Sequence, residues 1–197
     1  MSIDNKTLNY KDFINKVLID GVDKMINQGF EYYAFVIICQ GIEVLGSFYD
    51  TEEIDKYGES ETRFKAGLRN LFKNSFYKQN QDWLFRILRG NMIHKLRPGK
   101  EIVLTSYNIS KTPMKYHLKK DEDGRRIFVI EKFFEDFKDA CERLITKIEL
   151  EKDNLHKDKQ TVNYLNIFEK NISNVNVIFS GDTASNISAK SENIQEE

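Results

Sequence analysis

The stretch YYAFVIICQGIEVLG, from Tyr32 to Gly46, is the most apolar run in the sequence, and it decides the fold class. It has about 15 residues and includes the polar side chains of Gln40 and Glu43. It is therefore too short and too polar for a membrane span, which needs about 20 apolar residues. A helix that is apolar on all sides is buried by its neighbours. The stretch predicts the central buried helix of a soluble helical bundle.

Four further segments show apolar residues at helical spacing, so we expect five helices in all. Ser60 stands where a side chain would cap the third helix, and the polar sequence YKQNQ at 77–81 would separate the third helix from the fourth. The fifth helix is expected to pack on the first two. The expected helices span Lys11–Asn27, Phe30 to about Phe48, Ser60 to about Phe76, Asn80 or Gln81 to about Leu96, and Glu131 to about Asp153.

The helical period stops at residues 98–99 (Pro-Gly), after which the pattern becomes strand-like. Residues 101–106 (EIVLTS) form a short strand candidate. In 114–131, apolar residues alternate on both sides of the sequence DEDG at 121–124, which is typical of a turn between two paired strands. The expected fold is therefore mainly all-α, an antiparallel helical bundle of about five helices. A small β-hairpin at about 101–130 would be inserted before the last long helix.

The length of 197 residues indicates one domain with an appended segment. We expect a helical domain over 1–153 and a C-terminal extension over 154–197, where the helical pattern weakens. Within the extension, 161–168 is expected to add a helical turn and 174–179 a lone strand. Residues 180–197 are poor in apolar side chains, so they are expected to be disordered or to form an extended arm.

The two cysteines and the polar N-terminal sequence indicate a cytoplasmic protein. Cys39 and Cys141 lie in separate apolar stretches, as expected of buried thiols in a reducing compartment. The first residues, MSIDNKTLNYKDF, lack the apolar core of a secretory signal. Because no Cys-x-x-Cys sequence or Cys/His cluster occurs, we expect no metal and no cofactor.

Charged residues are sorted along the chain, although the net formal charge is only −1. Six acids stand against one lysine in 50–61, a local charge of −5, and ten cations stand against one aspartate in 63–100, a local charge of +9. Such a block is neutralised either by distant acids, for example those of 50–61, or by a bound polyanion. The second interpretation predicts a phosphate-binding surface. The cations expected to bind RNA there are Arg63, Lys65, Arg69, Lys73, Lys95 and Arg97.

Near its end, the fourth expected helix carries Arg86, Arg89 and His94, with Asn91 between them. The arginines lie on adjacent turns, and a frayed helix end would bring the histidine toward them. The helix C-terminus favours a protonated imidazole whereas the arginines oppose it, so His94 is expected to titrate near neutral pH. This set supports metal-independent cleavage of RNA, in which the histidine takes the proton of a ribose 2′-hydroxyl and an arginine holds the phosphate. A second histidine, needed to protonate the leaving oxygen, would come from the other copy in a dimer.

Glu43 lies inside the apolar central stretch, where an unpaired carboxylate would be costly. We expect it to pair with an arginine, either Arg89 or Arg86. Such a pair would be purely structural or would orient the arginine at the site. His117, which is expected in the middle of a strand, is assigned no role.

The sequence RGNMIH, Arg89 to His94, fits the Arg-x4-6-His motif of the HEPN superfamily (higher eukaryotes and prokaryotes nucleotide-binding). Together with YYAFVIICQGIEVLGSFY, RFKAGLRNLF and LFRILRGNMIHKLRPGKEIVLT, it resembles a group of uncharacterised bacterial HEPN-like proteins over about 10–150. The resemblance implies a helical bundle, usually a homodimer, with Arg89 and His94 catalytic in a cleft between protomers that cuts RNA. It also implies a defence or toxin–antitoxin setting, with an antitoxin or other protein partner. No membrane is expected, because the apolar run at 32–46 is too short and too polar to span one.

The sequence departs from the family pattern at two positions. Gly90 follows the arginine where active members often have a polar residue, and Leu96 stands where modified toxin members carry a tyrosine. Because many HEPN proteins are non-catalytic, two functions stay open: a metal-independent endoribonuclease, or a non-catalytic RNA-binding or protein-interaction module of the same fold. A third alternative, a helical protein whose basic helix only forms a dimer interface, predicts no nucleic-acid binding.

Overall fold

The computed structural model describes residues 5–54, 56–150 and 161–165. The chain divides into two units, one made of Met1–Leu8 with Val162–Glu197 and the other of Asn9–Thr161. Strands β1 (Asn5–Asn9) and β4 (Thr161–Leu165) pair in a two-stranded sheet.

Strand β4 shows that the helical turn expected at 161–168 is wrong, because Thr161–Leu165 is extended and paired. The strand expected at 174–179 and the arm expected at 180–197 lie outside the described residues. The expected domain boundary at 153/154 stays a prediction.

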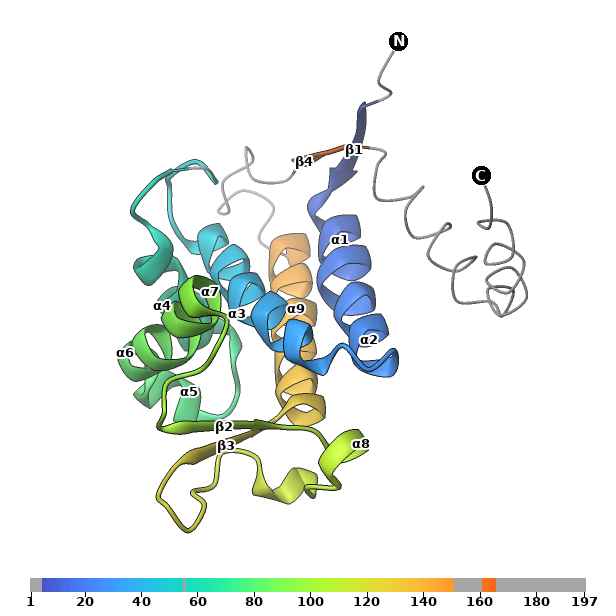
Figure 1. Cartoon of the computed structure of the whole chain (residues 1–197). Coiled ribbons are helices and arrows are strands. Elements are labelled where there is room, and N and C mark those ends of the chain that lie inside the picture. Colours follow the sequence, from blue (N-terminus) through green and yellow to red (C-terminus); the bar gives the residue numbers. More distant parts are fainter. Residues whose placement is uncertain (1–4, 55, 151–160, 166–197) are drawn as a thin grey trace, which may run out of the picture. The chain divides into compact units, whose positions relative to one another are not determined.

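The unit Asn9–Thr161 is mostly helical (Figure 1). Its first helical stretch begins where the Asn9 side chain accepts a hydrogen bond from the backbone N–H of Asp12, at 2.8 Å. The stretch ends at Asn27, as expected, shortly before Gly29, whose φ of 81° favours glycine. The elements are α1 (Tyr10–Phe13), η1 (Ile14–Ile19), α2 (Asp20–Asn27), α3 (Glu31–Gly46), η2 (Ser47–Tyr49), α4 (Ser60–Leu71), α5 (Ser75–Gln79), α6 (Gln81–Trp83), η3 (Leu84–Arg89), α7 (Gly90–Lys95), α8 (Tyr107–Ser110), η4 (Met114–Tyr116) and α9 (Ile130–Leu150).

Helix α3 is the central helix that the apolar stretch predicts. In Figure 1 it runs between the α1–α2 helix on one side and α4 and α7 on the other, and it also contacts α9. Together with η2 it forms a continuous helical stretch, Glu31–Tyr49, that is long and apolar enough to cross a bilayer by length and composition. That stretch is longer than the run of about 15 residues seen in the sequence. The core helix of a soluble protein passes the same test, and Ile38, Cys39 and Ile42 are fully buried here.

Helices α3 and α4 pack so closely that their backbones nearly touch. A Cβ atom added to Gly46 would lie 1.7 Å from the carbonyl oxygen of Arg63, and one added to Gly67 would lie 2.4 Å from the carbonyl oxygen of Ile42. Only glycine allows this approach, since any side chain would collide with backbone. The close contact fixes α4 against the half of α3 that carries Glu43.

The third helix differs from its expected bounds at both ends. Ser60 does not cap it, because its hydroxyl donates to Glu43 instead, at 2.8 Å. The helix ends at Leu71 rather than near Phe76, with a break at 72–74 that was not expected. Within the expected break at 77–81, the turn at Asn80 separates α5 from α6. A new helix, α5, starts there because the Asn74 side chain accepts from the N–H of Phe76, at 3.0 Å.

The fourth helical stretch, from α6 through η3 to α7, covers Gln81–Lys95 and confirms the helix expected over about 81–96. It contains a π-helical segment, η3, that no sequence pattern indicated, and η1 in the first stretch is a second one. Leu96 ends α7 with a left-handed conformation, φ 49°.

The expected β-hairpin is wrong for the strands of the sheet, although an isolated antiparallel bridge between Lys120 and Arg126 does form beside the turn at 121–124. Strand β2 (Ile102–Thr105) pairs with β3 (Arg126–Val129) in parallel, so that Ile102 faces Arg126 and Thr105 faces Val129. Parallel strands need a long crossover, and here residues 106–125 supply it with α8 and η4. The alternation at 114–118 suggested a strand, but Met114 and Tyr116 are exposed and form a 3-10 turn. The turn at 121–124 does exist, with Gly124 at φ 77°.

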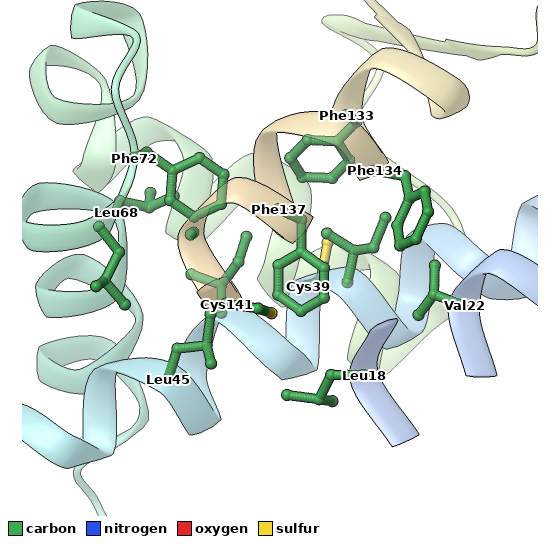
Figure 2. Packing of buried hydrophobic residues seen from close by; sticks show 14 of the residues in the cluster. Leu18, Val22, Cys39, Leu45, Leu68, Phe72, Phe133, Phe134, Phe137 and Cys141 are labelled. Carbon is green, nitrogen blue, oxygen red and sulfur yellow. The ribbon is translucent and has the colours of Figure 1, made fainter. Parts of the chain in front are cut away.

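The long helix α9 closes the core and confirms that the fifth helix packs on the first two (Figure 2). Its phenylalanines lie among side chains from the α1–α2 helix, α3 and α4, as Figure 2 shows. Both cysteines are buried free thiols, as expected. The core residues labelled there are Leu18, Val22, Cys39, Leu45, Leu68, Phe72, Phe133, Phe134, Phe137 and Cys141.

Candidate nucleic-acid interface

Arg89, the arginine of the Arg-x4-6-His sequence, is buried and bound to Glu43. Its side chain is 8% exposed and that of Glu43 13%. The guanidinium Nη2 donates to Oε2 of Glu43, while Oε1 of the same carboxylate accepts from the hydroxyl of Ser60, at 2.8 Å. The Cζ atom of Arg89 lies 5.5 Å from the ring centroid of Phe85. The expected pairing of Glu43 with an arginine is therefore confirmed, and the partner is Arg89.

The pair lies against the core of the helical unit. Its positive member is close enough to Cys39 to act on that thiol: burial raises the pKa of Cys39 to about 12, and the charge of Arg89 opposes this rise. The Nε atom of Arg89 is buried and has no hydrogen-bond partner in the described part of the chain. While it binds Glu43, the guanidinium is not available to a phosphate at the surface.

His94, in contrast, is exposed on α7. Within the residues that the structure describes, its imidazole makes no hydrogen bond or ion pair. The structure thus gives the two motif residues different surroundings: Arg89 is directed to α3, and His94 to the surface. They do not form a hydrogen-bonded pair within one copy of the chain.

The +9 block is partly neutralised by acids of the same fold. Arg63 is the clearest case, because its buried guanidinium binds Asp50 at 2.8 Å and also donates to the backbone carbonyls of Glu53 and Ile54. Expecting Arg63 at an RNA surface was therefore wrong, since it has almost no exposed area and holds the 50–54 loop instead. The other ion pairs of the block are Lys65 with Glu61 and Asp82, Lys73 with Asp139, and Arg89 with Glu43.

Six cations of the block are exposed and form no ion pair among the described residues. Arg69, on α4, is one of the cations expected at an RNA surface, and Arg86, on η3, was expected to support the motif. Three others follow one another at the end of α7 and in the loop after it. The six are Arg69, Lys78, Arg86, Lys95, Arg97 and Lys100.

Hydrogen bonds hold the loop after α7 against η3 and α3. The carbonyl oxygen of Ile87 accepts from the backbone N–H of Gly99, at 2.9 Å, and from the side-chain amide of Asn91, at 3.1 Å. The hydroxyl of Tyr32, on α3, donates to the carbonyl oxygen of Leu96. These bonds hold the residues from 95 to 100 against the helix.

An open pocket of about 530 Å³ results between η3, α7 and this loop. Asn91 and Glu101 form part of its wall. The carboxylate of Glu101 accepts a hydrogen bond from the indole N–H of Trp83, at 2.8 Å. Its three cations, Lys95, Arg97 and Lys100, are exposed. Asn91 thus lines a basic pocket rather than connecting Arg89 to His94.

Two further cations lie close by, and no pattern in the sequence indicated them. Arg126, on β3, donates its backbone N–H to the carbonyl oxygen of Glu101 at 2.7 Å, and Lys120 precedes β3 in the crossover. They reach the end of the basic segment only because β3 pairs in parallel with β2. A pairing between such distant segments has no local pattern in the sequence.

The described residues contain no group of three or more His, Cys, Asp or Glu side chains that would hold a metal ion. The chain matches no protein-family model, and no curated protein or solved structure matches it. The resemblance to HEPN proteins therefore rests on the motifs of the sequence alone.

Proposed function

We propose that this chain is an RNA-acting, HEPN-like protein that holds the RNA backbone with the unpaired cations at the end of α7. The antiparallel five-helix bundle and the homodimer of that family are part of the proposal. The observation that carries it is the pocket in which Lys95, Arg97 and Lys100 gather without an acidic partner among the described residues.

Phosphate is the chemistry that fits this pocket. Like charges held near one another repel, and a phosphate backbone relieves the repulsion while it releases its own counterions. Asn91 adds a polar side chain to the same wall. Glu101 also lines the pocket, but its carboxylate accepts a hydrogen bond from the indole N–H of Trp83.

The test is binding of a labelled single-stranded RNA, followed by fluorescence anisotropy at low salt. Replacing Lys95 and Arg97 together by glutamate should raise the dissociation constant at least about ten-fold, because two phosphate contacts become repulsions. A matched double variant, Lys16→Glu with Lys24→Glu, changes the net charge equally at exposed positions that do not line the basic pocket. It should bind almost as the unchanged protein does. Equal weakening by both variants would place the RNA elsewhere.

Cleavage of the bound RNA is the second candidate function, and the exposed, unpartnered imidazole of His94 favours it. The histidine would take the 2′-hydroxyl proton, and the His94 of the second copy would protonate the leaving oxygen. Arg89 would first have to leave Glu43, so the neighbouring Lys95 and Arg97 are better placed to hold the phosphate. The cytoplasmic defence or toxin–antitoxin setting, with an antitoxin as partner, belongs to this candidate.

Incubation with total RNA in EDTA tests it. Cleavage should yield 2′,3′-cyclic phosphate ends, and a 2′-deoxy substitution at the cut should prevent it. His94→Ala should lower the rate roughly 100-fold or more while binding persists. Binding without any cleavage would leave the non-catalytic module as the function of the fold.

A further inference from the structure

A second pocket, of about 370 Å³, adjoins the basic pocket, because Glu101 lines both. One wall comes from α5 and α6 and from the residue between them, and the other from β3 and the turn before it. Its size lies within the range of small-molecule sites, about 300–1,000 Å³. The lining residues are Phe76, Asn80, Trp83, Glu101, Lys120, Gly124 and Arg126.

This pocket combines aromatic and cationic surfaces. The rings of Phe76 and Trp83 meet edge to face, with centroids 6.5 Å apart. The guanidinium of Arg126 lies over Phe76, with its Cζ atom 4.7 Å from the ring centroid, and donates to the carbonyl oxygen of Leu118 at 2.5 Å. Aromatic rings and flat guanidinium groups are the surfaces on which unpaired nucleic-acid bases stack.

The charges of the two pockets point to a ligand that is a base and a phosphate together. Lys120 and Arg126 form no ion pair with any described residue, like the three cations of the basic pocket. Five cations thus line the two pockets against one carboxylate, Glu101. That carboxylate is an acceptor for the exocyclic amino group of a base, and the indole N–H of Trp83 already fixes its position.

We infer that the second pocket binds an unpaired base of single-stranded RNA, and that the cations of both pockets bind the phosphates next to it. This inference rests on the proposed RNA function and specifies its substrate as single strands rather than duplex. In a duplex the bases are stacked on one another and their faces are not accessible. A free nucleotide offers the same chemistry, so the test must separate it from RNA.

Trp83 is the only tryptophan of the chain, which makes its fluorescence a direct probe of the pocket. Three ligands are titrated: a single-stranded oligonucleotide, a duplex of the same sequence, and a nucleoside 5′-monophosphate. Anisotropy of the labelled oligonucleotide measures binding independently of the tryptophan. The inference predicts that the single strand quenches Trp83, whereas the duplex and an abasic strand quench it far less.

Neighbouring lysines provide a matched pair of variants. Lys120 lines the pocket, whereas Lys119 is exposed and lies over the ring of Tyr116 instead. Lys120→Glu should weaken single-strand binding several-fold more than Lys119→Glu. By anisotropy, Trp83→Leu should lose roughly ten-fold in affinity and Trp83→Phe should keep most of it, because one stacked base is worth that much.

The outcomes are distinct. Quenching by the single strand and not by the duplex, with Lys120→Glu the weaker binder, supports the inference. If the strand binds without quenching and the two lysine variants bind alike, the inference is overturned and RNA binding stands. If no RNA binds by anisotropy, the proposed function falls and the inference with it. Quenching by the monophosphate alone would make the pocket a nucleotide site and overturn RNA as its occupant.

Discussion

The carboxylate of Glu43 and the guanidinium of Arg89 bind one another inside the helical unit and join α3 to η3. The same carboxylate holds Ser60 at the start of α4. One buried ion pair thus connects three helical elements, and it occupies the arginine that the Arg-x4-6-His motif would assign to a phosphate. The first role of Arg89 in this chain is therefore to stabilise the fold.

Removing one member of this pair should destabilise the fold strongly. Glu43→Ala leaves a buried guanidinium without its counter-ion, so the free energy of unfolding in urea should fall by about 3–5 kcal/mol. The double variant Glu43→Leu with Arg89→Met should recover part of that loss, because it leaves no buried charge. Lys11→Met breaks the exposed pair between Lys11 and Glu149 and should have no measurable effect. A Glu43→Ala protein as stable as the original would contradict a structural role.

The close contact of α3 and α4 predicts opposite results for two glycine substitutions. Gly67→Ala places a Cβ atom 2.4 Å from the carbonyl oxygen of Ile42, so the helices must separate at a cost of about 1–3 kcal/mol or more. In Gly21→Ala the nearest atom is the carbonyl oxygen of Lys16, at an ordinary 3.6 Å. The free energy of unfolding of the Gly21→Ala protein should rise by up to about 1 kcal/mol. Thermal melts of both variants measure these changes, and equal melting temperatures would refute the close contact between α3 and α4.

A buried network around His117 makes stability depend on pH. Nδ1 of His117 accepts from the N–H of Val129 at 3.1 Å, Nε2 lies 2.9 Å from the hydroxyl of Tyr77, and that hydroxyl donates to Asp136 at 2.8 Å. Burial, together with the nearby charge of Lys132, lowers the pKa of His117 from 6.5 to about 3. On acidification the unfolded chain therefore binds the proton first.

The network's contribution to the free energy of unfolding should be complete above about pH 6.5 and should decline as the pH falls toward about 3. The loss should approach about 1.4 kcal/mol per pH unit within that window. Urea unfolding at pH 7, 6, 5 and 4 measures it. In His117→Leu the fold is weaker at pH 7, yet this part of the pH dependence should be absent. An unchanged slope in that variant would assign the acid sensitivity to other groups.

His94→Ala separates chemistry from stability. Because the exposed imidazole has no partner among the described residues, the substitution should leave the unfolding midpoint within the error of the measurement. Any loss of RNA cleavage would then be a direct effect on proton transfer. A clear drop in stability would show instead that the imidazole holds the end of α7.

The sequence predicts the parts of this fold that depend on local periodicity. The apolar run at 32–46 predicts the central helix, because a helix that is apolar on all sides is buried by its neighbours. The acid inside that run requires a buried partner because an unpaired carboxylate there is costly; the sequence allowed Arg86 or Arg89, and the structure shows Arg89. The long fifth helix and its contacts with the first two were predictable in the same way.

Features that depend on distant segments were not predictable. The parallel pairing of β2 with β3 joins residues more than twenty positions apart, whereas the DEDG turn favoured a local hairpin. The burial of Arg63 follows from the close approach of α3 and α4, which places the guanidinium against the 50–54 loop. The second pocket depends on that same sheet, so Lys120 and Arg126 could not be assigned to the site beforehand.

The salt dependence of RNA binding tests the central claim most directly. Neutralising Lys95, Arg97 and Lys100 together with glutamine should reduce the slope of log K against log salt by about 2, since each phosphate contact on a single strand contributes about 0.7. The triple control Lys16→Gln, Lys24→Gln and Lys138→Gln removes the same charge from exposed positions outside both pockets. We expect the control to keep the slope of the unchanged protein. A slope that the pocket variant leaves unchanged would contradict the claim that these cations hold the RNA.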